Sequence, residues 1–330
     1  MEEFNQNEVR SRFSNLGLRY LAGAVGAIVI QLGFAKLIGV LFPTVELSPT
    51  LQLLVAMLPL MIIVYPLWIL FASKVPKVEG EKHSMTVGQM ILAFIMSFSI
   101  MYFSNLISNL VTTIIGALIS NPVENVLTPA TAAHPIAVIL LLVICAPVFE
   151  EIIFRKILID RLSRYGEGVA IVLAAAIFGL FHFNIGQGIY AFALGLFWGF
   201  IYTRTRKIQY TMILHMLINF YGMFVSLRVL DFFKLNELVE VAASKDVAAM
   251  TAYMTNNAGL ILGYYAYLFV LIGLAFTGAI LLIVKRKKFF LVPAQEKIPK
   301  GKGFSTAFCN LGIILFTLLC VAMCVYQLLS

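Results

Sequence analysis

Charged residues are scarce in this sequence. Lys, Arg, Asp and Glu together make up 12% of the 330 residues, whereas a soluble domain carries roughly a quarter. The hydrophobic share is 61% and the mean hydropathy is +0.95. This composition excludes an ordinary soluble domain and indicates an integral membrane protein.

Cysteine is also scarce, and all four cysteines lie in apolar runs: Cys145, Cys309, Cys320 and Cys324. They form no CxxC pair and have no ligand-like spacing to a histidine, so we interpret them as small side chains buried in the membrane. The formal net charge is +8. The basic residues stand in short patches between apolar runs, which is typical of topology signals, and we expect no nucleic-acid partner.

Long apolar runs predict an all-α fold, a polytopic transmembrane helix bundle of about nine spans, with eight as the alternative. The expected spans cover residues 17–38, 50–72, 87–118, 135–158, 168–183, 187–203, 208–227, 259–284 and 305–328. We divide the chain into N-terminal transmembrane helices (1–134), a motif-bearing core (135–227), and a C-terminal part (228–330) that begins with a loop or interfacial helix.

The basic patches predict the orientation in the lipid bilayer. They fall on alternate loops and, with nine spans, on one side of the membrane, at residues 10–19, 74–82, 161–164, 204–207 and 285–288. The excess of Lys and Arg on cytoplasmic loops therefore predicts a cytoplasmic N-terminus. The loop 228–258 carries both signs of charge at helical spacing. It is interpretable as an interfacial helix, a lid or a plain connecting helix.

Two adjacent carboxylates, Glu150 and Glu151, lie inside a predicted span. A charge near the bilayer centre costs about 2.5–3.5 kcal/mol, so such residues usually face a cavity and have a function. Glu151 has Arg155 four residues later, the favourable order for a helical ion pair, which leaves Glu150 as the freer acid. Pro147 deprives the carbonyl of Val143 of its usual donor and is expected to kink this helix.

Two histidines and an amide also lie inside predicted spans. His182 ends the next apolar run, and counting about 1.5 Å per residue from the turn places it at the same depth as Glu150. Two spans later, His215 and Asn219 are four residues apart and share one helical face. Each residue alone is compatible with a structural role. Together they predict a catalytic or transport site, because burying the whole set is costly.

Four short patterns, in order along residues 135–225, resemble the motifs of the CAAX protease and bacteriocin-processing family. They are EEIIFR at 150–155, the Phe178 and His182 pair, the Phe192, Gly195 and Gly199 set, and the His215 and Asn219 pair. Gly195 and Gly199 have the small-xxx-small spacing that lets helices approach closely. The sequence has no HExxH motif and no paired membrane aspartates, which other membrane proteases use.

The resemblance implies an intramembrane endopeptidase acting on a membrane-embedded or lipidated peptide, in a bacterial plasma membrane. Glu150 would activate water with His182, while His215 and Asn219 would donate to the oxyanion. Glu151 and Arg155 would support this helix face. No cofactor is favoured, although Glu150, His182 and His215 also form a set of ligand types found in zinc enzymes. The alternatives are a non-catalytic immunity or scaffolding protein of the same fold, and a proton-coupled or ion-coupled transporter.

Overall fold

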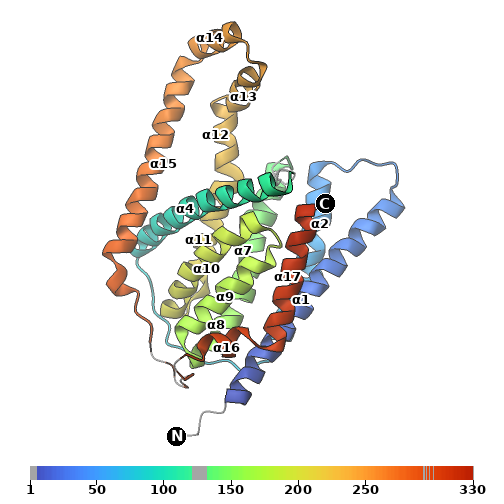
Figure 1. Ribbon diagram of the computed structural model, residues 1–330, viewed down its shortest axis with the longest axis vertical. Coiled ribbons are helices and arrows are strands. Elements are labelled where there is room, and N and C mark those ends of the chain that lie inside the picture. The colour runs from blue at the N-terminus through green and yellow to red at the C-terminus, as the bar shows by residue number, and fades with distance from the viewer. Residues whose placement is uncertain are drawn as a thin grey trace.

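All regular structure in the described part of the chain is helical (Figure 1). The computed structural model describes residues 6–120, 132–292, 294, 296, 298, 299 and 301–329. The first half contains α1 (Gln6–Leu41), α2 (Pro49–Pro59), η1 (Leu60–Val64), α3 (Tyr65–Ala72), α4 (Val87–Ile119), α6 (Pro135–Val138), η2 (Ile139–Cys145), α7 (Ala146–Glu151), η3 (Ile152–Ile157), α8 (Leu158–Leu162) and η4 (Ser163–Tyr165).

The second half of the chain continues the same pattern of long helices joined by short turns. It contains α9 (Glu167–Phe181), α10 (Ile185–Thr205), α11 (Ile208–Phe220), η5 (Tyr221–Val225), α12 (Ser226–Phe232), α13 (Leu235–Ser244), α14 (Val247–Asn256), α15 (Ala258–Val284), η6 (Arg286–Lys288), α16 (Gly303–Phe308) and α17 (Leu311–Leu329).

Each of the nine predicted spans corresponds to a helical segment, and eight of these segments in the described residues are long and apolar enough to cross a membrane. The ninth, α9, has 15 residues. At about 1.5 Å per residue it is roughly 22 Å long, shorter than the ~30 Å hydrocarbon core of a bilayer. The predicted all-α polytopic bundle of eight or nine spans is confirmed, and the short α9 is the segment by which the two counts differ.

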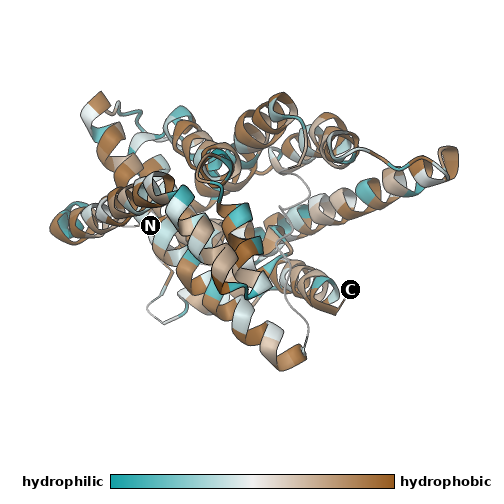
Figure 2. Ribbon diagram, turned by 90° about the horizontal axis from the view of Figure 1, so that it is seen from above, coloured by the Kyte–Doolittle hydropathy of each residue, from teal (hydrophilic) through white to brown (hydrophobic). Residues whose placement is uncertain are grey.

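The outer surface of the bundle is apolar. Figure 2 shows hydrophobic residues along the outward faces of the long helices, and large side chains such as Leu32, Ile62 and Phe269 are 65%, 69% and 79% exposed. In water such a surface would drive aggregation. It is the surface expected of an integral membrane protein, whose helices turn apolar residues outward to the lipid tails.

The loops that carry the basic patches lie at one end of the bundle. The Val78 amide donates to the carbonyl of Asp160 at 2.7 Å, and the His83 amide donates to the carbonyl of Thr205 at 2.9 Å. The N-terminus lies at this end in Figure 1. At the opposite end, α12, α13, α14 and α15 form a projecting arm. In the predicted loop 228–258, residues 228–232 continue α12, and α13 and α14 form the tip of that arm.

Helices α1 and α17 approach closely because glycines face each other. A Cβ at Gly312 would lie 2.0 Å from the carbonyl oxygen of Ser14, and one at Gly17 would lie 2.6 Å from the backbone of Gly312. At this contact the Gly312 amide also donates a hydrogen bond to Ser14 Oγ at 3.0 Å. The contact joins the two ends of the chain.

We expect Gly312→Ala to destabilise the protein by about 1–3 kcal/mol, since the added methyl group would force α1 and α17 apart. The measurement is the thermal unfolding midpoint in detergent. Gly33→Ala on α1 is the matched control, because nothing lies within 4 Å of a Cβ there. Equal midpoints for the two variants would contradict this account of the contact between α1 and α17.

Candidate active site

The helix that carries the two glutamates is irregular on both sides of them. Two π-helical stretches, η2 and η3, flank the short α7 that contains Glu150 and Glu151. A π-helical stretch contains an extra residue per turn and rotates the side chains that follow it, which is why such stretches recur at functional sites. The local backbone therefore sets the direction of both acids.

Pro147 accounts for the irregularity before the acids. The Ala146 amide donates to the carbonyl of Leu141, five residues back. In this register the next carbonyl, that of Leu142, would need the amide of residue 147, and proline has none. The side-chain amide of Asn219 on α11 donates to that carbonyl instead, at 2.9 Å. A side chain of a neighbouring helix thus satisfies the Leu142 carbonyl, for which this register has no backbone donor.

Glu151 and Arg155 form the predicted ion pair, and the structure adds a third member. Arg155 Nη1 lies 3.3 Å from Glu151 Oε1, and these side chains are 1% and 0% exposed. His215 Nδ1 lies 3.0 Å from the same carboxylate oxygen. Breaking a buried pair of this kind leaves an uncompensated charge, so the three groups depend on one another.

Two aromatic rings enclose this charged group. The Arg155 guanidinium lies over the ring of Phe178, 3.8 Å from its centroid, and 5.5 Å from that of Trp198. The face of an aromatic ring attracts a cation, more strongly where water is excluded. Trp198 also packs on His215, with ring centroids 4.8 Å apart, and its Nε1 donates to Ser97 Oγ of α4 at 3.0 Å. The rings fix both the arginine and the histidine.

His215 stands between the two glutamates. Its Nδ1 faces Glu151, while its Nε2 lies 3.6 Å from Glu150 Oε2, an ion-pair distance that is longer than a hydrogen bond. The two acids differ in their surroundings, because the Glu150 side chain is 16% exposed and Glu151 is fully buried. Glu150 is therefore the acid that can meet water or substrate.

His182 lies at the C-terminal end of α9. Its Nδ1 is 2.9 Å from the carbonyl of Phe178. A carbonyl can only accept, so Nδ1 is the donor, and the neutral ring carries its lone pair on Nε2. His182 also packs edge-to-face on the Phe178 ring, with centroids 4.8 Å apart. Phe178 thus positions His182 through both its backbone and its side chain.

All four predicted catalytic residues line one cavity of about 320 Å³ inside the bundle: Glu150, His182, His215 and Asn219. Gln187 and Tyr190 of α10 and Tyr65 of α3 add polar groups to its wall, and Trp198 closes one side. The irregular turn between α9 and α10 borders this cavity. Non-helical backbone within a membrane is tolerated where it lines such a space.

Gly195 and Gly199 of α10 lie close to α9, as their small-xxx-small spacing predicts. A Cβ at Gly195 would lie 3.1 Å from Ala175 Cα, and one at Gly199 would lie 3.2 Å from the side chain of Ile171. These contacts press α10 against α9. Trp198 was not among the predicted site residues, although it stands one residue before Gly199 in the same motif.

A zinc site at Glu150, His182 and His215 is not preformed. Within the described residues, no three His, Cys, Asp or Glu side chains are grouped closely enough to hold one metal ion. His215 already has Glu151 on one nitrogen and Glu150 near the other. In this arrangement these residues thus do not fit a metal ion.

Comparison with known proteins places this site in a family context. The sequence model of the type II CAAX prenyl endopeptidase Rce1-like family matches residues 132–221. "Putative membrane peptidase YdiL" of Bacillus subtilis (strain 168) is 32% identical over 77 residues, which are 23% of this chain and 32% of that protein. The aligned part thus spans about a third of that relative's length, and no solved structure matches the chain.

The family match covers both glutamates, both histidines and Asn219. The predicted resemblance to the CAAX protease family is thereby confirmed over residues 132–221, which supply most of the residues that line the cavity.

Proposed function

We propose that this protein is an intramembrane endopeptidase that hydrolyses a peptide bond in a membrane-associated or lipidated peptide. One observation carries the proposal: an acid, two imidazoles and an amide line a single cavity inside an apolar helix bundle. The match of residues 132–221 to the type II CAAX prenyl endopeptidase Rce1-like family supports it, and so does the similarity to a relative named as a membrane peptidase.

The first step activates a water molecule. Glu150 is the partly accessible carboxylate of the pair, and it takes one proton from water. The lone pair on His182 Nε2 accepts a hydrogen bond from the same water and directs it. The hydroxide attacks the peptide carbonyl, and a tetrahedral oxyanion forms. Protonated Glu150 then donates its proton to the leaving nitrogen, which releases an acid and an amine.

The second requirement is stabilisation of the oxyanion. An amide side chain has two donor hydrogens, and Asn219 uses one on Leu142, which leaves the other for the oxyanion. His215 donates through Nε2 when its ring carries both protons, with Nδ1–H held by Glu151. Donors fixed before the reaction are usually the largest contribution to catalysis.

Glu151 and Arg155 position the other groups. Arg155 holds the Glu151 carboxylate, which holds His215, and both lie outside the cavity wall. We propose a metal-independent reaction, because the Asn219 side-chain amide, on the same helical face as His215, suits an oxyanion better than a metal ion. We also propose that the N-terminus lies in the cytoplasm of a bacterium, since the basic loops gather at the N-terminal end.

Glu150→Gln should lower peptide hydrolysis about 10²–10⁴-fold, because glutamine cannot take a proton from water. The substrate is a prenylated peptide with a CAAX tail in liposomes that contain the purified protein, and mass spectrometry identifies the products. Glu46→Gln is the matched control, since Glu46 is exposed in the loop before α2. Hydrolysis at the parental rate by Glu150→Gln would overturn the proposal.

Two further measurements, one in the same liposomes and one in cells, separate the two alternatives. Substrate that accumulates uncleaved inside the vesicles would favour a transporter. A Glu150→Gln protein that still protects cells from a bacteriocin would favour a non-catalytic immunity protein. The peptidase proposal requires instead that cleavage is lost together with the acid.

Glu151→Gln should destabilise the protein by about 3–5 kcal/mol, because it leaves Arg155 as a buried charge without its counter-ion. Glu150→Gln changes the same number of atoms one residue away, at a side chain that is 16% exposed, and should alter stability far less. Thermal unfolding in detergent measures both. The opposite ranking would contradict the roles assigned to the two acids.

Chelation tests the metal-independent mechanism. Treatment with 1,10-phenanthroline and dialysis should leave hydrolysis of the peptide unchanged, with less than one equivalent of metal per protein by elemental analysis. Loss of hydrolysis that zinc restores would instead support a site at Glu150, His182 and His215. An unrelated zinc peptidase treated in parallel confirms that the chelator acts.

A further inference from the structure

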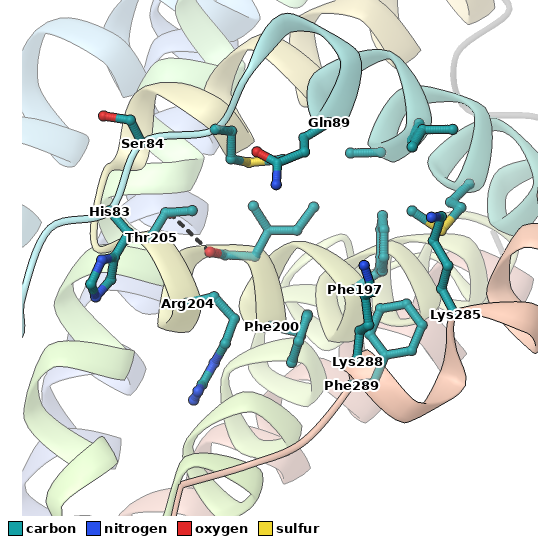
Figure 3. A pocket seen from close by; sticks show the side chains of 15 residues that line it. His83, Ser84, Gln89, Phe197, Phe200, Arg204, Thr205, Lys285, Lys288 and Phe289 are labelled. Carbon is teal, nitrogen blue, oxygen red and sulfur yellow. Dashed lines mark hydrogen bonds between the residues drawn. The ribbon is translucent and has the colours of Figure 1, made fainter.

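A second cavity of about 310 Å³ lies at the basic end of the bundle, between α4, α10 and the turn after α15 (Figure 3). It shares none of its lining residues with the candidate active site. Figure 3 shows Gln89 of α4 on one side, Phe197 and Phe200 of α10 on another, and Lys285 and Lys288 on a third. Its volume is in the range of small-molecule sites, about 300–1,000 Å³.

The lining of this cavity has two chemically different parts. The inner part is apolar and comes from α4 and α10: Leu92, Ala93, Met96, Phe197, Phe200 and Ile201. The rim is cationic and comes from Arg204, Lys285 and Lys288. A ligand that matches both parts has an anionic head and an apolar tail.

The positive charge at the rim is only partly compensated. Arg204 is paired with Glu167. Among the ion pairs of the described residues, none includes Lys285 or Lys288. Two lysines that share one rim without a carboxylate between them attract an anion, and phosphate is the anion most abundant at a membrane surface.

The basic turn is held in place beside α10. Phe289 follows η6 and packs edge-to-face on Phe200, with ring centroids 5.1 Å apart, and on Phe197 at 6.2 Å. This contact keeps Lys285 and Lys288 at the rim of the cavity while Arg286 and Lys287, in the same turn, lie outside its lining. The turn therefore presents a selected pair of its four cations.

We propose that this cavity binds an anionic phospholipid, with the headgroup phosphate at Lys285 and Lys288 and an acyl chain along α4 and α10. The cavity lies where Thr205 ends α10 and Val284 ends α15, at the depth where lipid headgroups meet the spans. Basic pockets between transmembrane helices suit such headgroups, and each nearby Lys or Arg contributes about 1 kcal/mol to the attraction.

The position of the lipid links it to the candidate active site. Met96 lines the cavity and precedes Ser97, which accepts the hydrogen bond from Trp198 Nε1. Trp198 in turn packs on His215. A lipid that fills the cavity braces the interface of α4 and α10 at which this tryptophan is held. The proposal itself concerns binding and does not depend on peptidase activity.

The test compares lipid binding by the parent protein with that of two double variants of equal charge. Purified protein in neutral detergent is titrated with phosphatidylglycerol or phosphatidylcholine, and native mass spectrometry and the thermal midpoint report binding. Phosphatidylglycerol should remain bound and raise the midpoint of the parent, and phosphatidylcholine should not. Lys285→Gln with Lys288→Gln should weaken phosphatidylglycerol binding at least 10-fold.

The matched control is Arg286→Gln with Lys287→Gln, which removes the same charge from the same turn but not from the cavity. It should bind phosphatidylglycerol like the parent. Equal loss in both double variants would overturn the proposal, because it would indicate general attraction to a basic surface. No preference of the parent for the anionic lipid would also overturn it.

Two further measurements address the apolar part and the source of the phosphate. Leu92→Trp keeps every charge and fills the inner cavity, so it should weaken phosphatidylglycerol binding even if the lysine variants fold poorly. Inorganic phosphate should not shift the midpoint of the parent, because it has no acyl chain. A full shift by inorganic phosphate, or unchanged lipid binding by Leu92→Trp, would contradict a lipid ligand.

Discussion

The buried ion pair of Glu151 and Arg155 is the constraint around which the core of this protein is built. Neither charge can be solvated, since the two side chains are 0% and 1% exposed, so each needs partners from the protein itself. Those partners come from three other helices: His215 from α11, Phe178 from α9 and Trp198 from α10. Meeting the electrostatic need of one pair thus assembles the helices that enclose the cavity.

The same arrangement separates two neighbouring acids into different roles. Glu151 is bound by Arg155 and His215, whereas Glu150, one residue earlier, lines the cavity. The π-helical stretches on both sides of α7 make this separation compatible with a continuous span. Asn219 is needed for the stretch before Pro147, because it satisfies a carbonyl that no helical amide can reach. An amide that supports the helix and lines the cavity has both a structural and a proposed chemical function.

Helix α4 and helix α10 connect the candidate active site with the proposed lipid cavity. They meet through Ser97 and Trp198, next to His215, and other residues of both helices line the proposed lipid site. The end of the bundle that gathers positive charge therefore also contains the apolar space that an acyl chain would fill. The basic patch at residues 285–288, which predicted the orientation in the membrane, thus also contributes to the proposed lipid site.

Much of the architecture was predictable from the sequence because it depends on local properties. Run length and hydropathy determined the nine helical segments and the membrane class, and helical spacing determined that Glu151 pairs with Arg155. Counting residues from one turn also placed Glu150 and His182 at a common depth, and both line the same cavity. These inferences need only the geometry of a single helix or hairpin.

The tertiary structure alone decided which faces of different helices meet. That His215 lies between the two glutamates, that Trp198 packs on it, and that Asn219 serves Leu142 all depend on how each helix is rotated about its axis. The sequence by itself determined which groups are buried in the membrane; only packing decided which of them face one another, since rotation and register are set by contacts between segments far apart in the chain.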